Sequence, residues 1–180
     1  MTGRSHPAQT PPLRRHAALQ PLSREHMSGL IHARTLRQSA ERDVEARSAA
    51  VADFVRIWEA EIEHHFDDEE RLLLPLTSDA HLRARLLDEH RALRELAGRC
   101  RSEPAEIAAD PAALRRLGTL LHDHIRWEER VFFEAVQREH PDALASLLGA
   151  AGEIERDRPG ARARYRLDQA ATDHPKEPPA

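Results

Sequence analysis

The sequence predicts an all-α protein, an up-down-up-down four-helix bundle with a short extra helix at its C-terminal end. No segment alternates apolar and polar residues with a period of two, and only 7 of 180 residues are glycine, so we expect no β-sheet. Four long segments instead repeat apolar residues every three to four positions. Amphipathic helices joined by short links pack as antiparallel neighbours, which gives a bundle.

The first two helices have recognisable boundary residues. Leu22 and Ser23 signal the start of the first, with Ser23 as its N-cap, and we expect this helix to end near Gln38. The second is expected from about residue 41 to Leu74, because Pro75 cannot continue the hydrogen-bond ladder of a helix. Both segments carry an apolar stripe along one face, as expected of helices that pack against partners.

The remaining helices are bounded in the same way. The third is expected over residues 79–100 and ends at Cys100, which we interpret as a small apolar residue. The fourth begins at Asp110, a cap that is followed by proline at the first helical position, and runs to Glu139. A short fifth helix over residues 142–155 is expected to pack on the outside of the bundle.

The helices define one domain, the bundle of residues 21–155. Residues 1–20 are rich in proline and should form a flexible N-terminal tail. Residues 156–180 are polar and also rich in proline, so we expect a disordered C-terminal tail.

Composition excludes several classes of protein. The formal net charge is −4, with both signs mixed along the chain, so we expect neither nucleic acid nor a membrane surface as partner. The single cysteine allows no disulfide and no cysteine metal site within one chain. No apolar run approaches the roughly 20 residues of a membrane span. We therefore expect a soluble, cytoplasmic protein.

Histidines and glutamates interrupt the apolar stripes of the four long helices. A histidine falls on each helix, and in the second and fourth a glutamate follows one turn later. The segments are SREHMSGL, HHFDDEE, LDEHRAL and HDHIRWEE. The candidate metal ligands are His26, His65, Glu69, His90, His124 and Glu128. Histidine with carboxylate is the ligand set of non-haem iron and similar divalent metals.

The spacing places these side chains on inner faces at matching levels. His65 and Glu69 are separated by about 40° around a helix and by about 6 Å along it, so both can face the core. In an antiparallel bundle the start of the first helix meets the end of the second, which brings His26 to the level of Glu69. A surface ion pair would explain a single His–Glu pair. It does not explain why five of these residues replace apolar ones, where buried unpaired charge would cost several kcal/mol.

Three neighbouring glutamates leave alternatives open. Glu70 and Glu129 point about 100° away from the ligand glutamates, so they either orient a ligand histidine or are solvated. We favour the solvated interpretation, which predicts that Glu70→Ala leaves metal binding intact. Glu61 lies one turn before His65 and either orients a ligand histidine or is a partly exposed helix residue.

The motifs resemble those of the hemerythrin-like family, also called HHE cation-binding domains. The resemblance covers residues 22 to about 140, through EH in the first helix, HFDDEE in the second, EH in the third and HIRWEE in the fourth, in family order. It implies a four-helix bundle that holds two iron ions as a non-haem di-iron centre with an oxo or hydroxo bridge. The implied ligands are His26, His65, Glu69, His90, His124 and Glu128, with both glutamates bridging.

Departures from the oxygen-carrying members narrow the expected function. Those proteins have a fifth histidine on the third helix, where this chain has Leu86 and Arg94, and they use H-x4-D where this chain has H-x3-E. The chain is more similar to the bacterial four-histidine, two-glutamate branch, which includes proteins linked to repair of iron centres after nitrosative stress. We expect it to bind or react with dioxygen, nitric oxide or peroxide, possible alternatives being a non-catalytic metal-stabilised sensor or interaction module, or iron storage and delivery. Whether it is an enzyme stays open.

Overall fold

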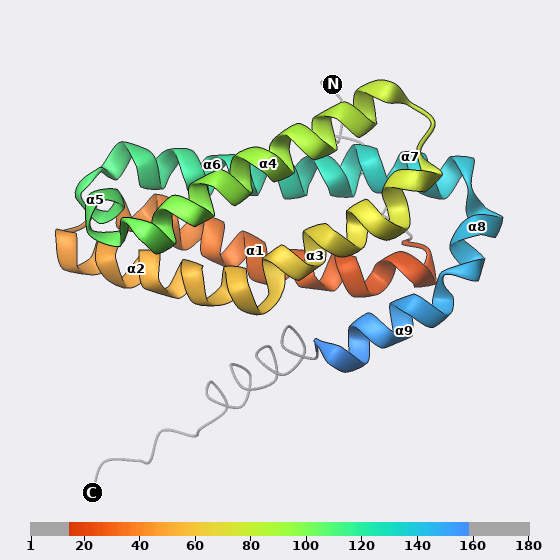
Figure 1. Ribbon diagram of the computed structural model, residues 1–180, viewed down its shortest axis with the longest axis horizontal. Coiled ribbons are helices and arrows are strands. Elements are labelled where there is room, and N and C mark those ends of the chain that lie inside the picture. The colour runs from red at the N-terminus through yellow and green to blue at the C-terminus, as the bar shows by residue number, and fades with distance from the viewer. Residues whose placement is uncertain (1–14, 159–180) are drawn as a thin grey trace, which may run out of the picture.

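Four long helical segments lie side by side in the computed structural model, which describes residues 15–158 (Figure 1). The first is α1 (Gln20–Ser39), and the third is α4 (Ala80–Ser102). The second joins α2 (Val44–Ile57), η2 (Trp58–Ile62), α3 (Glu63–Asp68), η3 (Glu69–Leu73) and η4 (Leu74–Leu76). The fourth joins α6 (Pro111–Trp127), η5 (Glu128–Phe132) and α7 (Phe133–Glu139). The described residues contain no strand, so the predicted all-α bundle is confirmed.

Aspartate caps start three of the four segments, as their sequences indicate. The side chains of Asp43, Asp79 and Asp110 each accept a hydrogen bond from a backbone N–H in the first turn that follows. The predicted Ser23 cap is wrong, because α1 begins three residues earlier and the Ser23 hydroxyl instead donates a hydrogen bond to Glu129. A polar side chain near the start of a helix can thus bond to a side chain of another helix instead of capping its own helix.

Three π-helical turns, η2, η3 and η5, interrupt the second and fourth segments. In each turn a backbone N–H donates to the carbonyl five residues earlier, so one extra residue is inserted. Two of these turns begin at the predicted ligands: Leu74 N–H donates to the Glu69 carbonyl, and Phe133 N–H donates to the Glu128 carbonyl. Such turns are frequent at functional sites, and sequence periodicity did not reveal them.

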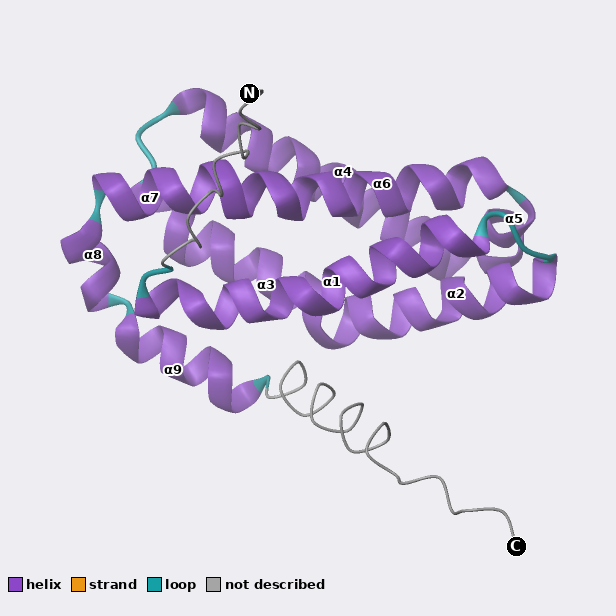
Figure 2. Ribbon diagram, turned by 180° about the vertical axis from the view of Figure 1, so that it is seen from behind, coloured by secondary structure: helices purple, strands orange, loops and turns teal. Residues whose placement is uncertain are grey.

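Short helices complete the described chain at both ends of the bundle (Figure 2). The link between α4 and α6 contains a short helix, α5 (Pro104–Ala109), which the sequence pattern did not predict. The predicted fifth helix is divided at Leu147 into α8 (Pro141–Ser146) and α9 (Leu148–Asp157), and α9 packs on the outside against α1 and η1.

The N-terminal boundary of the bundle differs slightly from the expected one. Part of the expected tail forms η1 (Ala17–Leu19), in which Ala18 and Leu19 are buried against the bundle. The other residues expected to be flexible or disordered, 1–14 and 159–180, lie outside the described residues.

Two apolar clusters fill the interior, one towards each end of the bundle. One cluster joins α1, α2, α4 and α6 and includes Phe54, Trp58 and Cys100, all of which are buried. The other joins η1, the start of α1, α7, α8 and α9. The predicted ligands lie between these two clusters. None of the described helices combines the length and apolar character that a membrane span requires.

Candidate metal centre

The structure brings all six predicted ligands together in the interior of the bundle. Each side chain is at most 5% exposed, and four of them are fully buried. They come from all four long segments: His26 from α1, His65 from α3, Glu69 from η3, His90 from α4, His124 from α6 and Glu128 from η5.

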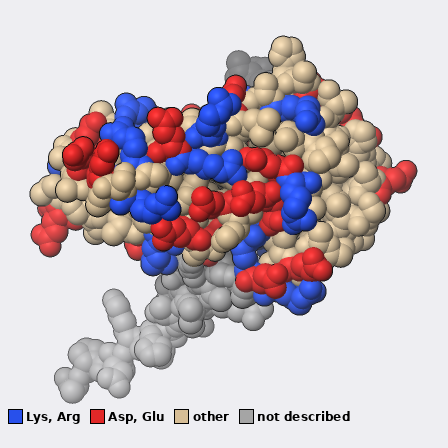
Figure 3. Space-filling model, in the orientation of Figure 1, with Lys and Arg blue, Asp and Glu red and all other residues tan. Residues whose placement is uncertain are grey.

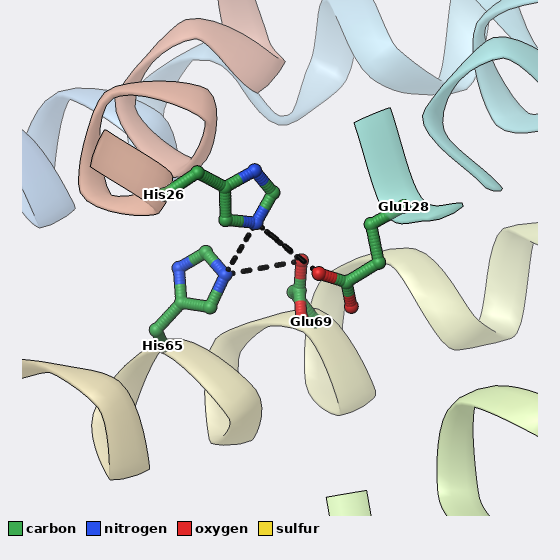
Figure 4. Close-up of side chains that lie close together, drawn as sticks. All are labelled: His26, His65, Glu69 and Glu128. Atoms are coloured by element: carbon green, nitrogen blue, oxygen red, sulfur yellow. Dashed lines mark hydrogen bonds and ion pairs between the residues drawn. The ribbon is translucent and has the colours of Figure 1, made fainter. Parts of the chain in front are cut away.

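The ligand atoms form two groups that share the glutamates. We call His26 and His65, together with the two glutamates, site A, which Figure 4 shows in close-up. Site B consists of His90 and His124 with the same glutamates. Within each group the candidate ligand atoms lie within 4.8 Å of one another, so a single ion could contact all of them.

Each glutamate directs one oxygen towards each site. Glu69 Oε1 lies 3.2 Å from His65 Nε2, and its Oε2 lies 3.3 Å from His90 Nε2. Glu128 repeats this arrangement, with Oε2 3.2 Å from His26 Nε2 and Oε1 3.0 Å from His124 Nε2. Two carboxylates that each face both histidine pairs have the geometry needed to bridge two metal ions.

The polar atoms at the centre fit a pair of cations. Six buried atoms make no hydrogen bond: both carboxylate oxygens of Glu69 and of Glu128, and Nε2 of His90 and of His124. A buried polar atom without a partner costs about 1–3 kcal/mol, and more when it is charged. Two divalent ions would neutralise the carboxylates and accept the lone pairs of the imidazoles, which removes this cost.

At site A, a carboxylate also holds the outer nitrogen of each histidine. Glu129 lies 2.6 Å from His26 Nδ1, and Glu25 lies 2.9 Å from His65 Nδ1. When Nδ1 donates its proton to such a carboxylate, Nε2 is left as the lone-pair nitrogen that points into the centre. These hydrogen bonds therefore fix both the tautomer and the orientation of the rings.

Site B repeats this arrangement with Glu70, 2.8 Å from His90 Nδ1, and Glu89, 2.9 Å from His124 Nδ1. The solvated interpretation of Glu70 and Glu129 is therefore wrong. In a bundle, the direction 100° away from the centre leads to the neighbouring helix rather than to solvent, and that helix carries the histidine that each carboxylate contacts.

The four outer carboxylates form a closed ring around the bundle. Each one contacts the histidine of the next long segment: the first segment contacts the second, the second the third, the third the fourth and the fourth the first. Sequence reasoning gave no role to Glu25 and Glu89, although each directly precedes a candidate ligand histidine. Glu61 is buried, and Glu25 is the carboxylate that lies 2.9 Å from His65 Nδ1.

The carboxylates raise the pKa values of the buried histidines. Burial opposes protonation of His65, but Glu69 and Glu25 outweigh it and raise its pKa to about 9. Burial likewise opposes protonation of His90, whose pKa Glu128 and Glu69 raise to about 10. Without metal, these imidazoles therefore hold protons at neutral pH, and a metal ion must displace them.

Aromatic rings shield the histidines from water. The Phe66 ring stacks on His90 with 3.8 Å between ring centroids, and Phe133 stacks on His26 with 5.3 Å.

Leu86 is fully buried in the apolar cluster that includes α7 and α9. Arg94 lies over Phe66 and forms ion pairs with Glu70 and Asp67. Neither of the positions where a fifth histidine would be expected thus carries a candidate ligand.

Comparison with known proteins identifies the family. The model of the hemerythrin HHE cation-binding domain matches the chain twice, over residues 19–136 and 81–166. Comparison with curated proteins and with solved structures found no match. The two family matches together span most of the chain and include every residue of sites A and B. The chain belongs to the hemerythrin HHE cation-binding domain family.

Proposed function

We propose that this chain is a non-haem di-iron protein that reacts with a small molecule, either dioxygen, nitric oxide or peroxide. In this proposal His26 and His65 would hold one iron, His90 and His124 would hold the other, and Glu69 and Glu128 would supply a carboxylate oxygen to each. The main support is the set of six buried, unsatisfied ligand atoms, arranged so that each carboxylate faces both histidine pairs. Imidazole and carboxylate are ligands that suit iron.

The ligand count favours reaction with a small molecule over a closed structural site. Two histidines and two shared carboxylate oxygens give each ion four protein ligands, fewer than the six that iron commonly accepts. When bound, the irons would supply open coordination positions and electrons that can be exchanged with a small molecule. The protein contributes fixed imidazoles, through the ring of carboxylates, and a site from which stacked aromatic rings exclude bulk water.

A small cavity beside site A supports access by a molecule of a few atoms. It has a volume of about 10 Å³, near the lower limit for holding one water molecule, and is lined mainly by apolar atoms. Gly29, Ile62, Leu121 and Ile125 lie around it together with His26 and His65. A space this small disfavours substrates of more than a few atoms.

The test is to prepare the reduced protein without oxygen, count its metal ions, and mix it with each small molecule in a stopped-flow spectrometer. We expect about two irons per chain, air oxidation without a long-lived adduct, and a reaction with nitric oxide or peroxide. An oxygenated spectrum that returns to the reduced one when the gas is removed would instead indicate oxygen carriage. Zinc in place of iron without any reaction would indicate a metal-stabilised module, and many irons per chain would indicate storage.

A further inference from the structure

Each carboxylate of the outer ring is itself held by an arginine. Glu70 contacts Arg94 at 2.6 Å, and Glu89 contacts Arg85 at 2.8 Å. Glu129 contacts Arg15 at 2.6 Å. Glu25 contacts Arg158 twice, through Nε at 2.7 Å and through Nη2 at 3.3 Å. Every candidate ligand histidine is therefore the inner end of a histidine–glutamate–arginine chain.

The arginines have different origins at the two sites. At site B both arginines, Arg85 and Arg94, are on α4, one of the four long segments of the bundle. At site A neither arginine belongs to the bundle segments, because Arg15 precedes η1 and Arg158 is the C-cap residue of α9. Charged side chains of both signs are interleaved on the face of the protein seen in Figure 3. Among the four carboxylates of the outer ring, Glu25 is the most deeply buried.

Arg158 joins two acidic side chains that are largely buried. The side chain of Glu25 is 7% exposed, that of Asp68 is 11% exposed, and Arg158 itself is 15% exposed. Arg158 Nη2 also donates to Asp68 Oδ2 at 2.5 Å. Removal of this guanidinium would leave Asp68 with Arg71 alone and would leave Glu25, a poorly hydrated carboxylate, without its arginine, which disfavours the present position of Glu25.

The attachment of α9 decides whether Arg158 can reach Glu25. Ala151 and Ile154 bury the inner face of α9 in the apolar cluster that contains Leu22, and Glu155 forms an ion pair with Arg24 at 3.1 Å. These contacts tie α9 to α1, the helix that carries both Glu25 and His26. The helix has only 10 residues and packs on the outside, so its attachment is a local equilibrium that can open without unfolding of the bundle.

We propose that Arg158 is a positioning residue and that α9 sets the metal affinity of site A but not that of site B. Docked α9 brings Arg158 to Glu25, Glu25 fixes the ring of His65, and His65 presents Nε2 to the metal. Detachment of α9 breaks this series of contacts at site A, whereas the arginines of site B stay in place because both are on α4. The inference rests on the metal-binding part of the proposed function. Because coupling of binding equilibria is reciprocal, metal at site A strengthens the docking of α9 by the same factor.

Metal titration against a competing chelator tests the proposal on the full chain. Arg158→Ala should lower the affinity for one of the two ions by about 10–100-fold, which is the usual effect of losing a group that orients a ligand. The affinity for the other ion should not change. Arg158→Lys should restore part of this affinity, because its ammonium can contact Glu25 but cannot form the forked contact. Arg156→Ala is the matched control, since this arginine is exposed on the same helix. Mössbauer spectra should change for one iron only in Arg158→Ala.

Hydrogen exchange of the unmodified protein gives a second measurement that needs no variant. The amides of α9 should exchange more slowly when metal is bound, and this difference should disappear in Arg158→Ala. The proposal would be refuted if Arg158→Ala bound both ions with the same affinities as the unmodified protein. It would also be refuted if the exchange rates of the α9 amides were the same with and without metal. An unmodified protein that fails to bind two ions would refute the proposed function instead.

Discussion

The free energy of unfolding should depend strongly on metal, and Glu128→Gln should abolish that dependence. Gln has nearly the same volume as Glu, so the substitution opens no cavity. It removes the negative charge that faces both sites, with Oε1 3.0 Å from His124 Nε2 and Oε2 3.2 Å from His26 Nε2. Because this carboxylate belongs to both groups of ligands, a single substitution should weaken the binding of both ions.

The expected magnitude follows from binding to the folded state alone. At a free metal concentration of about 100 times Kd, each site stabilises the protein by about 2.7 kcal/mol. Two such sites contribute about 5 kcal/mol. For a domain of this size each kcal/mol raises Tm by roughly 2–4 °C, so metal should raise Tm by about 10–20 °C. The coupling arises because the six ligands, from four helical segments, are brought together only in the folded chain.

The assay is thermal unfolding under oxygen-free conditions, with and without ferrous ion. We expect the full shift for the unmodified protein and for Glu95→Ala, an exposed glutamate on α4 that contributes to neither site. The shift should nearly vanish for Glu128→Gln. A Glu128→Gln protein that is stabilised as much as the unmodified one would refute the bridging geometry.

Further predictions concern pH, the outer carboxylates and packing. Because the pKa of His90 is raised to about 10, metal must displace its proton, so metal affinity should rise with pH and binding should release protons; a chelator titration on either side of neutral pH measures this. Glu70→Ala should lower the metal affinity of site B by about 10–100-fold, contrary to the expectation for a solvated residue. Gly118→Ala places Cβ 2.6 Å from the Ala33 carbonyl oxygen and should cost about 1–3 kcal/mol in chemical denaturation. Gly98→Ala has open space and should stabilise the helix by about 0.5–1 kcal/mol.

Local periodicity was sufficient to find the four long helical segments and their inner side chains. The i, i+4 spacing of His65 and Glu69 places both on one helical face, whatever the rest of the chain does. Proline and aspartate mark most helix ends for equally local reasons, as Asp110 does for α6. The sequence by itself therefore determined the fold class, the six candidate ligands and the level at which they meet.

Only the tertiary structure decided which side chains support those ligands. His26 and Glu129 are 103 residues apart, and Glu25 and Arg158 are 133 residues apart. Periodicity gives the direction of a side chain relative to its own helix, but not which neighbouring helix lies in that direction. The ring of outer carboxylates, and the attachment of site A to α9, depend on how four helices and a terminal helix pack against one another, and no local pattern contains that information.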